Sequence, residues 1–200
     1  MCTFKIAVMN QYIDHVLLDR QVIAARVAEL AGQITTDLSP VVDDLDPSAK
    51  LPDRPQLHVF AILDGSMIFL GDLVRQLPFL MRIHFLSITS YPGKSTISQG
   101  PVLNTPLPDD LNGTHVLIIE DIIDSGSTLR FLNEQIREQK PASLNTCVLL
   151  RKPTNAPEDF QAEYVGFDIP DKFIVGYGLD YGYYFRNLPD IVALKPEAFE

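Results

Sequence analysis

The segment VLIIEDIIDSGSTL, residues 116–129, sets acidic residues at the end of an apolar run. Glu120 and Asp121 close the run, and two apolar residues separate them from a third acid, Asp124. A loop of Ser, Gly and Thr follows and leads into a helical pattern. Unpaired charge beside a buried strand is costly, so these carboxylates need a cationic or hydroxyl-rich partner.

Strand-like and helical patterns alternate along the middle of the chain. The expected strands cover residues 57–63, 82–89, 115–120 and 143–150. Expected helices cover residues 19–34, with Asp19 as N-cap, residues 64–77, and the segment that carries Leu129, Leu132 and Ile136. This alternation predicts an α/β fold with right-handed βαβ units and a mostly parallel sheet.

Three regions break the alternation. Residues 37–55 are rich in Pro and Asp and are predicted to form an exposed connector, and SYPGKSTISQG, residues 90–100, to form a long loop. Residues 162–194, rich in Tyr and Gly, are expected to form short strands that pair with residues 12–18. The prediction is one domain, residues 1–200, with a core of about 19–160 and a hood lobe of about 1–18 and 161–200.

Composition excludes several classes of protein. The net charge of −10 argues against nonspecific nucleic-acid binding, which needs a basic surface. No apolar run has transmembrane length, and MCTFKIAVMN is too polar for a secretory signal, so the expected compartment is the cytoplasm. Cys147 lies in an apolar run and is predicted to be a buried thiol.

The small-residue loop indicates a kind of ligand. In open parallel sheets, ligands bind beyond the carboxyl ends of the strands. The segment DSGST opens a helix whose free N–H groups favour a phosphate, and the carboxylates beside it suit hydroxyls or a metal. The residues therefore predict a ligand that combines a phosphate with a sugar, and the alternative is a polar turn with an ordinary N-cap.

Other candidate motifs fail on their spacing. PGKST matches the end of a Walker loop, but Ile88 stands where that motif requires glycine. GYGLDYG carries Tyr181 in place of the third glycine of a dinucleotide fingerprint. The histidines show no zinc-like spacing.

Four segments together resemble a known family. VLIIEDIIDSGST resembles the phosphoribosyl-diphosphate (PRPP) motif of type I phosphoribosyltransferases, LDGS their diphosphate loop, and SYPGKSTISQG their mobile catalytic loop. RKPT followed by VGFDIPDKFIVGYGLDYGYYFRNLP resembles the base-binding part of hypoxanthine-guanine phosphoribosyltransferases. The resemblance runs from about Val16 to Leu194 and identifies the chain as a member of that family.

The resemblance implies a fold, a reaction and an assembly. The expected fold is a parallel-sheet core with helices on both faces and a small hood lobe from both chain ends. The expected enzyme of purine salvage transfers the phosphoribosyl group of PRPP to N9 of hypoxanthine or guanine, gives IMP or GMP and diphosphate, and requires Mg²⁺. Relatives are dimers or tetramers, so a homodimer or homotetramer is expected.

The resemblance also implies roles for individual residues. It makes Asp124 the general acid/base and has Ser90 and Tyr91 close over the site. The implied PRPP and phosphate contacts are Glu120, Asp121, Ser125, Gly126, Ser127, Thr128, Gly65 and Arg186. The implied purine contacts are Lys152 at O6, Phe173 stacked on the ring, Ile174 and Asp180. The implied metal contacts are Glu120, Asp121 and Asp180.

Two positions depart from the family pattern. Asp64 stands where relatives often carry Lys or Arg, directly after an expected cis peptide, and an acid there cannot pair with diphosphate. Ser127 replaces a frequent Lys. Alternatives also remain for single residues: Phe173 as a core residue, and Lys152 and Arg186 as solvated surface charges.

Two other functions remain open. The first is a transferase with xanthine as a main acceptor, since RKPT and DKFIVGYGLDYG speak against adenine and pyrimidines but discriminate weakly among 6-oxopurines. The second is a catalytically weak, ligand-sensing regulatory member of the fold. A regulator that binds nucleic acid would need a basic face, which the net charge of −10 disfavours.

Overall fold

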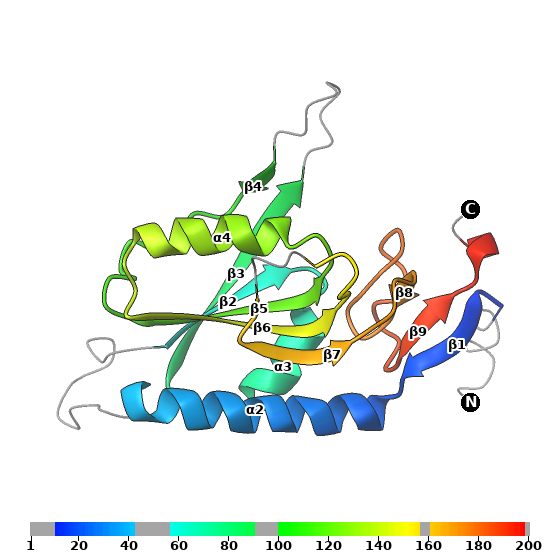
Figure 1. The fold of residues 1–200 in the computed structure, drawn as a ribbon, viewed down its shortest axis with the longest axis horizontal. Coiled ribbons are helices and arrows are strands. Elements are labelled where there is room, and N and C mark those ends of the chain that lie inside the picture. The colour runs from blue at the N-terminus through cyan, green and yellow to red at the C-terminus, as the bar shows by residue number, and fades with distance from the viewer. Residues whose placement is uncertain (1–10, 43–56, 91–99, 157–160, 199–200) are drawn as a thin grey trace.

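A computed structural model describes residues 11–42, 57–90, 100–156 and 161–198 (Figure 1). The central sheet consists of β2 (Leu57–Leu63), β3 (Met81–Ser90), β4 (Pro101–Leu103), β5 (His115–Ile123), β6 (Ser143–Arg151) and β7 (Tyr164–Asp168). The strand order is β4-β3-β2-β5-β6-β7, and every pair is parallel except β3 with β4. The predicted mostly parallel sheet is confirmed.

Helices cover both faces of this sheet, as predicted. The helices α2 (Arg20–Val42) and α3 (Met67–Val74) lie on one face, and α4 (Ser127–Glu138) lies on the other (Figure 1). Val59 and Ala61 of β2 pack with the α2 and α3 side, while Phe60 and Ile62 pack with the α4 side. Because both faces are buried, these strands are apolar along their length rather than alternating.

The first helix is longer than the sequence predicted. Asp19 caps it as expected, since its Oδ1 accepts hydrogen bonds from the N–H groups of Gln21 and Val22. However, α2 continues to Val42, through residues assigned to the connector. Leu38 and Val42 are buried at helical spacing and extend the apolar stripe. The rest of that connector, residues 43–55, lies outside the described residues.

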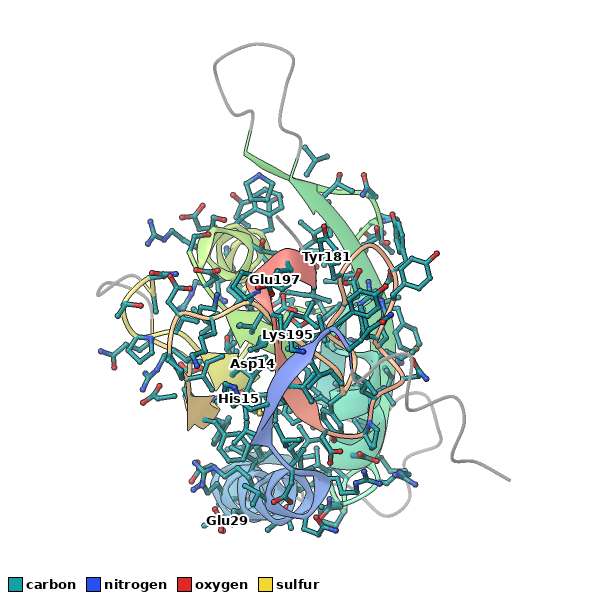
Figure 2. The ribbon with its side chains drawn as sticks, turned by 90° about the vertical axis from the view of Figure 1, so that its right-hand side faces the viewer. Asp14, His15, Glu29, Tyr181, Lys195 and Glu197 are labelled. Carbon is teal, nitrogen blue, oxygen red and sulfur yellow. The ribbon has the colours of Figure 1, made fainter. Side chains whose placement is uncertain are left out.

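The hood lobe joins the two ends of the chain. The strands β1 (Ile13–Leu18), β9 (Ile191–Leu194) and β8 (Ile174–Val175) form an antiparallel sheet in the order β1-β9-β8, and a short 3₁₀ turn follows (Pro196–Ala198). This confirms the predicted pairing of residues 12–18 with the tail. Figure 2, turned to face this lobe, shows Asp14 and His15 of β1 beside Lys195, just past β9.

The strand β7 is placed differently from the prediction. It falls within the residues expected to form the hood, yet it pairs in parallel with β6 and completes the edge of the central sheet. Arg26 of α2 holds it there by donating hydrogen bonds to the backbone carbonyls of Val165 and Gly166, both at 2.8 Å. The Tyr164 hydroxyl donates to Asp37 of the same helix at 3.0 Å. Contacts with a distant helix therefore decide the place of this strand.

Two further expectations concern burial and membranes. Cys147 is fully buried in β6, as predicted. Among the described residues, no helix is long and apolar enough to span a bilayer.

A pair of histidines, the buried His58 and the half-buried His84, lies on the α4 side of the sheet. The Nδ1 of His58 is 3.2 Å from the Nε2 of His84, and the two rings stack at a centroid distance of 5.2 Å. Burial lowers the pKa of both histidines, and the proximity of His84 lowers the pKa of His58 further. Two nearby charged groups have opposite effects on the histidine pKa values: Asp110 raises both, and Arg82 lowers both.

We expect this pair to make stability depend on pH. As the pH falls below about 6.5, the unfolded chain takes up protons that the folded histidines do not yet accept. The free energy of unfolding should therefore fall by at most about 1.4 kcal/mol per pH unit for each histidine. Urea unfolding at pH 7.5, 6.5 and 5.5 measures the slope. An unchanged slope in the His58→Phe variant would contradict this origin.

Candidate active site

The acidic residues lie near the carboxyl end of β5. This strand continues to Ile123, three residues beyond the predicted end at Glu120, because Ile122 and Ile123 pair with β6 in register. Glu120 and Asp121 thus lie within the last part of the strand, and Asp124 lies directly after it. The predicted end of the strand was wrong because the charged residues break the apolar pattern of the sequence but not the backbone pairing with β6.

Glu120 is buried and the adjacent Asp121 is half-buried. Burial raises the pKa of Glu120 well above its usual range, and the adjacent Asp121 raises it further. Burial also raises the pKa of Asp121, although a hydrogen bond with Glu120 and the charge of Arg186 oppose this. Buried carboxylates in this state are stabilised by hydroxyl donors or by a cation.

A small cavity joins these acids to the start of α4. Its volume is about 220 Å³, and it is lined by Glu120, Asp121, Ile122, Asp124, Ser125, Gly126, Ser127, Thr128 and Leu129. Gly126 precedes the helix with φ 67°, a left-handed conformation that glycine adopts readily. The structure therefore brings together the three acids and the small residues predicted as a phosphate cradle, with the N–H groups of a 12-residue helix at its edge.

A second cluster surrounds Asp124. Asn155 donates a hydrogen bond from Nδ2 to Asp124 Oδ1 at 2.8 Å, and Lys152 Nζ lies 3.6 Å from Asp124 Oδ2. Lys152 also pairs with Asp171 at 2.8 Å. The Lys152 side chain is only 12% exposed, so it is not a solvated surface charge. Asn155 and Asp171 were not predicted as site residues from the sequence. The one indication of their role was that they lie within the segments RKPTN and IPDKF.

Phe173 follows Asp171 of this cluster by two residues in the sequence. Phe173 is 40% exposed, so it is not a core residue, and Tyr181 meets it edge-on at a centroid distance of 5.4 Å. Ile174, the next residue, is buried in β8. An exposed ring face of this kind can stack on a flat aromatic ligand. Tyr181 was not selected from the sequence as a site residue.

A third cluster surrounds Arg186. Its guanidinium lies 2.8 Å from Asp180 and 3.5 Å from Asp64, and it donates to the Gly178 carbonyl at 2.7 Å. It is therefore a paired group and not a solvated charge. The bond between Leu63 and Asp64 is cis, as the resemblance implied.

Two glycines bring the third cluster close to Asp121 of the cradle. A Cβ on Gly65 would lie 1.6 Å from Asp121 Oδ2, and a Cβ on Gly178 would lie 2.0 Å from the Gly65 carbonyl oxygen. Neither position has space for a side chain. The close contacts place the loop after β2 directly against the acidic end of β5.

The predicted mobile loop follows β3. Tyr91 lies outside the described residues, as do positions 92–99 of the predicted mobile loop. Ser90 is the last residue of β3, and its side chain is not described. Among the described residues, no group of three or more His, Cys, Asp or Glu side chains could hold a metal.

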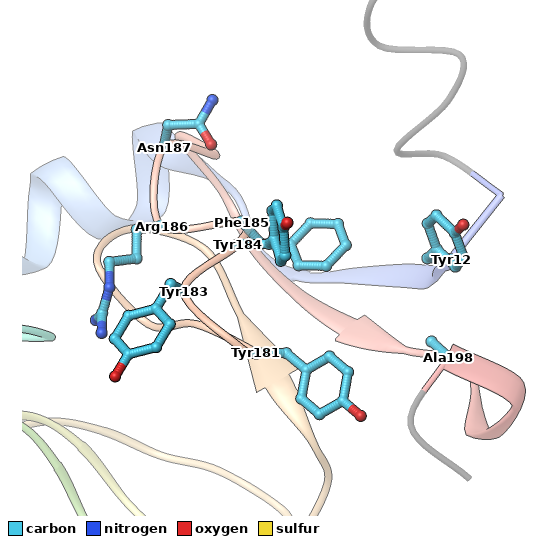
Figure 3. A pocket seen from close by; sticks show the side chains of 8 residues that line it. All are labelled: Tyr12, Tyr181, Tyr183, Tyr184, Phe185, Arg186, Asn187 and Ala198. Atoms are coloured by element: carbon cyan, nitrogen blue, oxygen red, sulfur yellow. The ribbon is translucent and has the colours of Figure 1, made fainter.

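Another cavity lies on the hood (Figure 3). Its volume is about 740 Å³, and it is lined by Tyr12, Tyr181, Tyr183, Tyr184, Phe185, Arg186, Asn187 and Ala198. It shares Arg186 with the third cluster and Tyr181 with the aromatic pair, but Glu120, Asp121 and Asp124 do not line it.

The chain is similar to proteins of known function. Residues 16–182 match the family model described as phosphoribosyl transferase domain. Hypoxanthine-guanine phosphoribosyltransferase of Bacillus subtilis is 38% identical over 96% of this chain and 99% of its own length. Hypoxanthine phosphoribosyltransferase of Haemophilus influenzae is 38% identical over 90% and 94%. A crystal structure of a Staphylococcus aureus hypoxanthine phosphoribosyltransferase has a TM-score of 0.83 at 36% identity, covering 96% of this chain and 97% of that chain.

Proposed function

Because the chain belongs to the phosphoribosyl transferase family, and within it to the hypoxanthine-guanine phosphoribosyltransferases, we propose that it converts a 6-oxopurine and PRPP into a purine nucleotide and diphosphate. The expected acceptors are hypoxanthine and guanine, and the reaction serves purine salvage. Neither xanthine as main acceptor nor a regulatory role without catalysis is favoured, since the relatives are named as hypoxanthine(-guanine) enzymes.

The observation that carries the proposal is the meeting of three clusters at the carboxyl end of β5. The cradle, with its buried acids, suits a phosphate and a sugar. The cluster around Asp124 offers a proton-transfer group and a lysine, and Phe173, two residues after Asp171 of that cluster, is a partly exposed aromatic ring. The cluster around Arg186 offers a guanidinium for a second anion. A ligand with two phosphate groups, a ribose and a partner base matches these three chemistries.

We assign the sugar and phosphate roles as follows. Glu120 and Asp121 accept hydrogen bonds from the ribose hydroxyls, and the loop formed by Ser125, Gly126, Ser127 and Thr128 cradles the 5′-phosphate. Gly65 allows the backbone after β2 to approach the diphosphate. Arg186 stabilises the negative charge that develops on the departing diphosphate.

The purine roles follow from the second cluster. Phe173 stacks on the base, the backbone of Ile174 meets its edge, and Lys152 donates to O6. Asp124 exchanges a proton with N7 as the bond to the sugar forms at N9. Ser90 and Tyr91 close over the site and exclude water, which would otherwise hydrolyse the activated sugar.

Mg²⁺ fits the donor set of this site. Desolvation disfavours the charged forms of the Glu120 and Asp121 carboxyls, which a cation would stabilise, and Mg²⁺ prefers one or two carboxylates together with substrate oxygens and water. The bound ion would neutralise charge on the diphosphate. Asp180 is the candidate for a second ion, although it also pairs with Arg186.

A steady-state assay tests the function. PRPP is supplied with hypoxanthine, guanine, xanthine or adenine, with and without Mg²⁺, and nucleotide formation is followed. We expect hypoxanthine and guanine to be used and the activity to be lost when Mg²⁺ is chelated. The absence of nucleotide from every base would overturn the proposal.

The cradle can be tested separately. Gly126→Ala should raise the Michaelis constant for PRPP far more than that for the base, because a side chain obstructs the approach of phosphate to the backbone. Gly126→Val should have the larger effect, since a β-branched residue rarely adopts φ 67°. Circular dichroism checks that the variants are folded. An unchanged PRPP constant in folded variants would remove the cradle assignment.

We also propose that the chain forms a two-fold symmetric homodimer or homotetramer. Ile83 and Phe85 are two residues apart in β3, so they point to the same face of the strand, and both are exposed. Exposed apolar groups that lie close together are typical of subunit contacts. Light scattering at micromolar concentration should give a multiple of 22.4 kDa, and a monomer would contradict the proposal.

A further inference from the structure

Arg186 is shared between two acids. One of its nitrogens, Nη2, lies 2.8 Å from Asp180 and 3.5 Å from Asp64. The other, Nη1, donates to the Gly178 carbonyl at 2.7 Å. The guanidinium that suits a diphosphate is therefore already engaged on both sides.

The two acids differ in how firmly they are held. The Asp180 side chain is 27% exposed, and its second oxygen accepts the N–H of Tyr183 at 2.8 Å, so it is part of the local turn. The Asp64 side chain is 62% exposed and has the longer contact with Arg186. An incoming anion would therefore displace Asp64 rather than Asp180.

We propose that Asp64 is an internal competitor for diphosphate at Arg186. The inference rests on the proposed function and adds a residue that tunes its diphosphate subsite. A carboxylate in this place pairs with Arg186 when the subsite is free, and it repels a phosphate group when the subsite is filled. Both effects weaken the binding of diphosphate and of the diphosphate end of PRPP, and both favour the release of diphosphate as a product.

The direct test is calorimetric titration with inorganic diphosphate, without Mg²⁺ and at fixed ionic strength. Asp64→Asn should tighten binding by roughly five- to twentyfold, the scale for removing one exposed charge beside a multiply charged anion. The gain should shrink at high salt, because salt screens exposed charges. Asp64→Ser, which removes the charge with a smaller side chain, should give the same direction.

Asp110→Asn is the matched control. Asp110 is also exposed, at 57% of its side chain, and also pairs with an arginine, Arg82, but it does not line the cradle or contact Arg186. Its replacement removes the same unit of charge and should change diphosphate affinity by less than twofold. Equal tightening by the Asp64 and Asp110 variants would reduce the effect to net charge and overturn the inference.

Weaker or unchanged binding of diphosphate by both Asp64 variants would also overturn the inference that Asp64 competes for Arg186. Nucleotide formation by the unmodified chain is measured on the same preparations. An active enzyme whose Asp64 variants bind diphosphate no more tightly overturns only the role of Asp64. A chain that forms no nucleotide overturns the proposed function, whatever the titrations give.

Discussion

Asp124→Asn is expected to lower turnover by about 10²–10⁴-fold, the usual loss when a general acid/base is removed. Asn155 donates a hydrogen bond to the Asp124 carboxyl, and Lys152 lies close to it. Glu120 and Asp121 lie earlier in the chain, within β5, where burial raises the pKa of Glu120. An amide keeps the shape of the side chain but cannot exchange a proton with the purine. The Michaelis constant for PRPP should therefore change much less than turnover does. Steady-state kinetics with hypoxanthine separates the two constants.

Asn155→Ala provides a graded comparison. It removes the hydrogen bond that orients Asp124 but leaves the carboxyl in place, so turnover should fall by less than in Asp124→Asn. Glu134→Gln, on the exposed side of α4, is the control for removing an acid and should retain normal kinetics. Near-normal turnover of Asp124→Asn across the pH range would remove Asp124 from the mechanism.

The second large effect concerns the choice of purine. We expect the unmodified protein to prefer hypoxanthine and guanine over adenine by as much as ~10⁴-fold, because a site that hydrogen-bonds one edge leaves a buried group unpaired with the wrong base. Lys152 offers only donors, which match O6 but meet the amino group of adenine. Stacking on Phe173 does not discriminate, since all purines present a similar ring face.

Lys152→Gln should weaken the use of 6-oxopurines and narrow the gap to adenine, because an amide has both a donor and an acceptor. Lys172→Gln removes the same charge from an exposed neighbour and should leave the purine preference unchanged. Relative kcat/KM values for hypoxanthine and adenine measure the gap. Comparable rates with both bases in the unmodified protein would contradict the role of Lys152 and leave the PRPP assignment intact.

Local pattern predicts most of the fold because each element carries its own periodicity. Apolar runs identified the main parallel strands, and the helical spacing of Leu129, Leu132 and Ile136 identified α4. The prediction was wrong where contacts with residues distant in sequence determine the extent or the place of an element. The last turns of α2 stay helical because Leu38 and Val42 are buried, and β7 joins the central sheet, where Arg26 holds its edge.

The candidate site also has a part that the sequence predicts and a part that it does not. The cradle is contiguous in sequence, so a single motif predicts it, and the structure brings those residues around one cavity. The partners of its charged groups come from segments far apart. Asn155 lies 31 positions from Asp124, and the partner of Asp64 is Arg186. No periodicity encodes such pairs, because they depend on how loops meet after the sheet has formed.

The hood has a consequence for the order of folding during synthesis. Its sheet needs β1 from residues 13–18 and β9 from residues 191–194, whereas the central strands pair with partners much nearer in sequence. Contacts between distant segments form slowly, and a growing chain gains its early segments first. On the ribosome, β1 must therefore wait unpaired while the cradle assembles. In a nascent chain, the proposed phosphate cradle should therefore form well before the proposed purine-binding part of the site.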